Sequence, residues 1–125
     1  MTGKRIIVCE DNEFLRKTLV LFMELDGHEV LDFSTADEVL QLSENVLQTI
    51  DVLLTDVDMP GTNGLQLSIE LKTLYPQLAV LIMSGKWVDL DNIKWLGARF
   101  FHKPFRHENL LKAIEVSAPI AMQML

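Results

Sequence analysis

The feature that most constrains this chain is the alternation of short β-branched apolar runs with longer stretches in which apolar residues recur at helical spacing. Residues 5–9, 28–33, 51–55, 78–83 and 98–102 have the length and composition of strands, and a helical stretch follows each one. Crossovers of this length give a parallel sheet with right-handed connections and helices on both faces. We therefore predict an α/β domain of five βα units.

Local features of the sequence refine this prediction. Thr35 to Glu38 has the pattern of a capping box, which predicts a helix that carries Val39, Leu40 and Leu42. Pro76 ends the apolar helical stretch that precedes the fourth strand. Trp87 to Leu96 predicts a short helix, and Arg106 to Val116 a last one.

Length and charge narrow the class of protein. The chain has 125 residues, enough for one domain, which we place at residues 1–117, with 118–125 as a tail or the start of a linker. The net charge is −7 without a basic run, which argues against direct nucleic-acid binding. Apolar runs are far too short to span a bilayer, so we expect a cytoplasmic protein. Cys9 lies in an apolar run and is expected to be a buried small side chain.

Polar residues that could bind a ligand or react with one follow four of the predicted strands. They are Glu10-Asp11, Asp56, Ser84-Gly85 and Lys103-Pro104. Ligands bind beyond the carboxyl ends of the strands in open parallel sheets, so these residues are expected to meet at one edge.

Three carboxylates brought together repel one another unless a cation balances them. Since Glu10, Asp11 and Asp56 offer only oxygen ligands, the suitable ion is a hard one such as Mg²⁺. A carboxylate in such a cluster can attack phosphorus and form an acyl phosphate. Lys103 can supply positive charge and Ser84 a hydroxyl donor to the oxygens that gain charge during the attack.

Four blocks of this sequence resemble the signature blocks of response-regulator receiver domains. The blocks are Glu10-Asp11, the segment from Asp56 to Gly64, Ser84-Gly85, and the segment from Phe100 to Phe105, and together they cover nearly the whole chain in the right order. The resemblance implies a flavodoxin-like (βα)5 fold, a doubly wound five-stranded parallel sheet in the order 2-1-3-4-5. The stretch between Ser84 and Lys103 is a few residues shorter than in similar proteins, which implies a trimmed fourth helix or trimmed loops.

The resemblance also implies a metal site. Asp11 and Asp56 would bind Mg²⁺ directly, Glu10 would act through water, and the main-chain carbonyl of Asp58 would complete the protein ligands.

The resemblance implies that Asp56 accepts a phosphoryl group from a sensor histidine kinase or a histidine phosphotransfer protein. Ser84 would bond the attached group, Lys103 would pair with it, and Phe100 would be the aromatic switch residue. The fourth helix, fifth strand and fifth helix would form the surface that binds a downstream protein or output domain, or a second copy. The chain would then be a slowly self-resetting switch and not a turnover enzyme. Similar proteins have a cis peptide between the residues that match Lys103 and Pro104.

Other functions use parts of the same pattern. Asp56-Val-Asp58 is similar to the nucleophile and acid pair of haloacid-dehalogenase-type phosphatases, but in that family the acidic metal-binding pair comes last in the chain. A flavodoxin-like FMN carrier would need a phosphate loop where Glu10-Asp11 stands, and these acids would repel the phosphate. A receiver-shaped interaction module without phosphorylation remains open.

Overall fold

The computed structural model describes residues 3–89 and 91–117, apart from the side chains of residues 92 and 93. The predicted tail, residues 118–125, lies outside this range. The sheet has five parallel strands in the order β2-β1-β3-β4-β5, which confirms the predicted topology. The strands are β1 (Arg5–Cys9), β2 (Glu29–Phe33), β3 (Val52–Asp56), β4 (Ala79–Ser84) and β5 (Arg99–His102).

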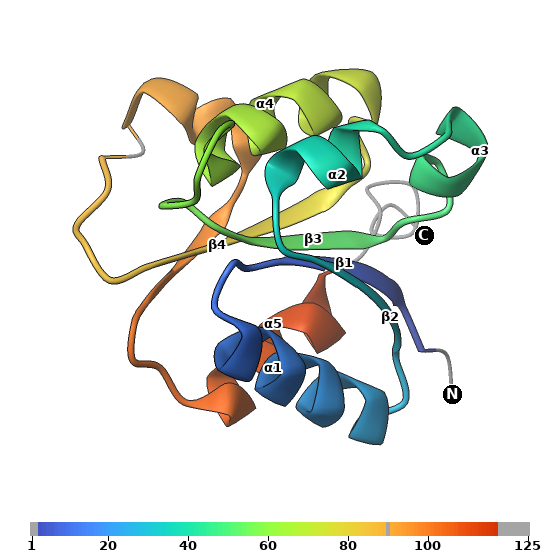
Figure 1. The fold of residues 1–125 in the computed structure, drawn as a ribbon, viewed down its shortest axis with the longest axis vertical. Coiled ribbons are helices and arrows are strands. Elements are labelled where there is room, and N and C mark those ends of the chain that lie inside the picture. Colours follow the sequence, from blue (N-terminus) through green and yellow to red (C-terminus); the bar gives the residue numbers. More distant parts are fainter. Residues whose placement is uncertain (1–2, 90, 118–125) are drawn as a thin grey trace.

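Helices cover both faces of the sheet. The α-helices are α1 (Glu13–Leu25), α2 (Ala36–Leu40), α3 (Glu44–Leu47), α4 (Gly64–Leu74) and α5 (His107–Val116). Figure 1 shows α1 and α5 on one face, and α2, α3 and α4 on the other. None of the helices in the described part of the chain is long and apolar enough to cross a membrane.

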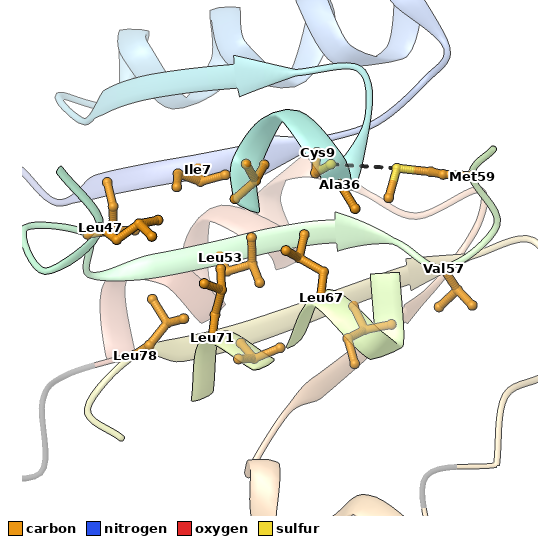
Figure 2. Packing of buried hydrophobic residues seen from close by; sticks show 14 residues of the cluster. Ile7, Cys9, Ala36, Leu47, Leu53, Val57, Met59, Leu67, Leu71 and Leu78 are labelled. Carbon is orange, nitrogen blue, oxygen red and sulfur yellow. Dashed lines mark hydrogen bonds between the residues drawn. The ribbon is translucent and has the colours of Figure 1, made fainter. Parts of the chain in front are cut away.

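Two apolar clusters hold these layers together. One lies between the sheet and α2, α3 and α4, with Leu53 of β3 and Leu67 of α4 among its fully buried members (Figure 2). The other lies between the opposite face of the sheet and α1 and α5, and includes Leu54 and Ile114. Adjacent residues of β3 point to opposite faces of the sheet. Because helices cover both faces, all five residues of this strand are buried. The last residue of this buried strand, Asp56, therefore lies at the edge of the sheet on main chain that is held in place by the core.

Two helix predictions were wrong in extent. The helix that begins after Thr35 ends at Leu40, and Ser43 caps the separate helix α3 by accepting a hydrogen bond from Val46 N–H. Leu42 therefore lies between two helices. The capping role of Thr35 itself is confirmed, since its hydroxyl accepts from Glu38 N–H at 3.2 Å.

The predicted helix from Trp87 to Leu96 is instead the 3₁₀-helix η1 (Asp91–Leu96). The carboxylate of Asp89 accepts the N–H of Asp91 at 2.9 Å, a local turn that starts the element late. Gly97 has a φ of 61° and ends it. Trp87 and Trp95 therefore do not share a helix. The predicted α-helix is trimmed to a single short element.

Gly64, the first residue of α4, touches the main chain of the central strand. A Cβ atom at this position would lie 1.9 Å from the carbonyl oxygen of Asp56 and 2.8 Å from Thr55 Oγ1. A side chain here would therefore push α4 away from the strand that carries Asp56.

We expect Gly64→Ala to lower the free energy of unfolding by about 2 kcal/mol, because the clash is with main chain that cannot move aside. Gly85→Ala is the matched control, since a Cβ at Gly85 meets nothing within 4 Å. The control is expected to change stability by less than about 0.5 kcal/mol. Urea unfolding of both variants measures the difference, and equal stabilities would contradict this description of the contact.

Candidate phosphoacceptor and metal site

The predicted site residues come together at one edge of the sheet. Glu10 and Asp11 follow β1, Asp56 ends β3, Ser84 ends β4, and Lys103 follows β5. Since the strands are parallel, their carboxyl ends lie at the same edge. The prediction that these residues lie at one edge of the sheet is confirmed.

Three carboxylates form the acidic part of this site. Glu10, Asp11 and Asp56 each offer an oxygen, and the three oxygens lie within 4.8 Å of one another. Glu10 is fully buried and Asp56 is 4% exposed, whereas Asp11 is exposed to solvent. All three donors are oxygens, the ligand type that suits a hard divalent cation.

Lys103 links two of these carboxylates. Its Nζ donates to Glu10 Oε1 at 2.7 Å and to Asp56 Oδ2 at 3.1 Å. Burial lowers the pKa of Lys103, but the hydrogen bonds to Glu10 and Asp56 outweigh it, so the net direction is upward. The lysine therefore stays charged and is the cation that balances the buried carboxylates. The Lys103–Pro104 peptide is cis, as predicted.

Glu10 is held by protein groups on both carboxylate oxygens. Oε1 accepts from Lys103, and Oε2 accepts from the N–H of Asn12 at 2.9 Å. Burial raises the pKa of Glu10, and Asp11 and Asp56 add to the rise, while the bonds from Lys103 and Asn12 only partly oppose it. A residue in this environment depends on its positive neighbour to remain ionised.

The loop after Asp56 is anchored to the core. Asp58 N–H donates to Asp56 Oδ1 at 3.3 Å, which places the main chain of Asp58 beside the carboxylate. The side chain of Met59 is buried and points to Cys9, whose thiol donates to the Met59 sulfur at 3.6 Å (Figure 2). Burial raises the pKa of Cys9 to about 12, so this thiol is protonated and serves as a packing group, as predicted. Sequence patterns gave no signal for the Cys9–Met59 contact.

Ser84 ends β4 at this edge of the sheet, whereas Phe100 lies within β5, and neither contacts Asp56 in the described hydrogen bonds and ring contacts. Ser84 Oγ lies 3.4 Å from Asp58 Oδ2 and accepts the N–H of Lys86 at 3.0 Å. The ring of Phe100 is half-buried and makes an edge-to-face contact with Trp87, with centroids 6.3 Å apart. Neither contact was anticipated from the sequence.

Comparison with known proteins identifies the family. The family model described as response regulator receiver domain matches residues 6–115. The chain belongs to the response-regulator receiver family. It is a receiver domain of the two-component type, and the shape of its sheet agrees with this assignment.

Individual relatives extend the comparison. The chain is 32% identical over 112 residues to the transcriptional regulatory protein FlgR of Helicobacter pylori, covering 88% of this chain and 28% of that protein. It is 27% identical to the response regulator receiver protein CpdR of Brucella abortus, covering 90% of this chain and 94% of that protein. A crystal structure of a receiver domain protein from Clostridium thermocellum has a TM-score of 0.83 and 29% identity, covering 98% of this chain and 99% of that one. This receiver thus spans about a quarter of FlgR and nearly all of CpdR.

We expect Lys103→Gln to destabilise the receiver by about 2 kcal/mol at pH 8 in metal-free buffer, because two buried carboxylates lose their cation. The loss should be smaller at pH 5. Without Lys103 the pKa of Glu10 rises further above its value in the unfolded chain, so the folded state holds a proton that the unfolded state has released. Stability then falls as the pH rises through that window.

Urea unfolding at pH 5 and pH 8 measures this dependence. Lys17→Gln is the control, since Lys17 pairs with Glu13 on an exposed face of α1 and its loss should cost less than about 0.5 kcal/mol at either pH. An equal loss for Lys103→Gln at both pH values would contradict the role of Lys103 as counter-ion.

Proposed function

We propose that this receiver is a phosphorelay switch that takes a phosphoryl group onto Asp56 from a phosphohistidine. The observation that carries the proposal is the Asp56 carboxylate, which is nearly buried between two other carboxylates and the Nζ of Lys103. The donor would be a sensor histidine kinase or a histidine phosphotransfer protein in the cytoplasm. The downstream partner would be a protein or output domain.

The residues present fit a magnesium ion. The donors are oxygens, they lie close together, and Asp11 is open to solvent, which leaves a route for a hydrated cation. In the proposal Asp11, Asp56 and the main-chain carbonyl of Asp58 would hold Mg²⁺, and Glu10 would act through water. When bound, the ion would neutralise charge on the phosphoryl oxygens.

The transfer step uses residues of this chain in defined roles. An Asp56 oxygen attacks phosphorus, the bond from phosphorus to the histidine nitrogen breaks, and the imidazole keeps the electron pair and takes up a proton. Lys103 pairs with the transferred group, and the hydroxyl of Ser84 donates to it. The N–H groups of Met59 and Gly85 are further candidate donors. Water later cleaves the acyl phosphate and resets the switch.

Phosphorylation would change the exposed face built by η1, β5 and α5. Ser84 would move toward the phosphoryl group and Phe100 would turn inward, away from Trp87. This face would then change its affinity for a partner, including a second copy of the chain. Slow self-dephosphorylation makes the domain a switch and not a turnover enzyme.

Intact-mass spectrometry after incubation with Mg²⁺ and acetyl phosphate tests the proposal. We expect one added phosphoryl group on the wild-type chain, none on Asp56→Asn, and none when a chelator removes the metal. Glu44→Gln, which removes an exposed acid on α3, should keep the adduct. A wild-type chain that gains no phosphoryl group would favour the interaction module, and sustained hydrolysis of a phosphate ester would favour the phosphatase.

A further inference from the structure

The hydroxyl of Ser84 already has a partner at each side. Ser84 is fully buried, and its oxygen accepts the N–H of Lys86 at 3.0 Å. A carboxylate can only accept, so in the 3.4 Å contact with Asp58 Oδ2 the hydroxyl is the donor. A serine has one hydroxyl proton, and that proton points to Asp58.

Asp58 is well placed to keep this contact. Its own N–H donates to Asp56 Oδ1, and the next residue, Met59, is fixed to the core by Cys9. The main chain of Asp58 therefore lies beside the phosphoacceptor while its side chain reaches the residue that ends the neighbouring strand. One residue stands between the two groups, Asp56 and Ser84, that the proposed switch must bring together.

We propose that the Asp58 carboxylate is a latch that holds the Ser84 hydroxyl away from the phosphorylation site in the resting state. The proposal rests on the proposed function, because it assigns Ser84 as the donor to the phosphoryl group. The Asp58 carboxylate and the phosphoryl oxygens then compete for the one hydrogen bond that the Ser84 hydroxyl can donate. Asp58 is a positioning residue, and its side chain sets how readily Ser84 engages the phosphoryl group.

Removing the Asp58 carboxylate has two separable consequences. It removes a negative charge near an anionic ligand, which favours binding whether or not Ser84 is present. It also frees the Ser84 proton, which favours binding only when the hydroxyl exists. A double-mutant cycle separates the two contributions.

The experiment measures the affinity of beryllofluoride, a phosphoryl mimic, in the presence of Mg²⁺ by isothermal titration calorimetry. The proteins are wild type, Asp58→Ala, Ser84→Ala and the double variant. We expect the gain in affinity from Asp58→Ala to be about fivefold larger with Ser84 present than with Ser84→Ala, as for the loss of one weak charge-assisted hydrogen bond. Asp58→Asn, which keeps an acceptor oxygen without the charge, should show a smaller Ser84-dependent gain. Equal gains in both backgrounds would overturn the latch.

A second measurement does not depend on the proposed function. In the ¹H–¹⁵N spectrum of the metal-free chain, the Lys86 amide reports on Ser84 because it donates to Ser84 Oγ. We expect Asp58→Ala to move this signal when Ser84 is present and to leave it in place in the Ser84→Ala background. A wild-type chain that binds no beryllofluoride but shows this dependence would contradict the proposed function and keep the Ser84–Asp58 contact. Normal beryllofluoride binding with no Ser84 dependence of the Asp58→Ala effect would support the proposed function and overturn the latch.

Discussion

The ion pairs of Lys103 with Glu10 and Asp56 are the contacts on which the site depends. Isolated carboxylates are costly to bury, by several kcal/mol each, unless a charge of opposite sign compensates them. Lys103 leaves the end of β5 and reaches Asp56 on β3 and Glu10 after β1, past the end of β4. One flexible side chain thus joins the carboxyl ends of strands that are not neighbours, and places a positive charge beside the nearly buried carboxylate of Asp56.

The rest of the fold keeps Asp56 and its loop in place. Gly64 lets α4 approach the carbonyl of Asp56, and Met59 fastens the following loop to Cys9 in the core. Asp58 is therefore held where its main chain faces Asp56 and its side chain faces Ser84. Phosphorylation would have to alter a set of contacts that is already satisfied, and that is what a switch with two alternative arrangements requires.

Much of this arrangement could be predicted from the sequence. The strands and their parallel order follow from local apolar patterns and crossover length, so the positions of Asp56, Ser84 and Lys103 at one edge followed as well. The break between α2 and α3 and the shortness of η1 could not be predicted. Ser43 and Asp89 each redirect the main chain through a single hydrogen bond.

Side-chain contacts across the site could not be predicted from the sequence. The strand ends predict that Ser84 lies near Asp56, but not that the Ser84 hydroxyl donates a hydrogen bond to the carboxylate of Asp58. The contact of Trp87 with Phe100 likewise depends on the irregular segment that replaces the start of the predicted helix. Such contacts arise from tertiary packing of residues far apart in the chain, for which local pattern carries no signal.

In the proposed function Asp56, and no other carboxylate at this edge of the sheet, takes the phosphoryl group. Borohydride reduction of the chain after treatment with Mg²⁺ and acetyl phosphate tests it most directly, because an acyl phosphate is reduced to an alcohol at the residue that carried it. Peptide mass spectrometry should find homoserine at position 56 and an unmodified Glu10, Asp11 and Asp58. Reduction at one of those three residues, or at none of the carboxylates, would contradict the assignment of Asp56 as the phosphoacceptor.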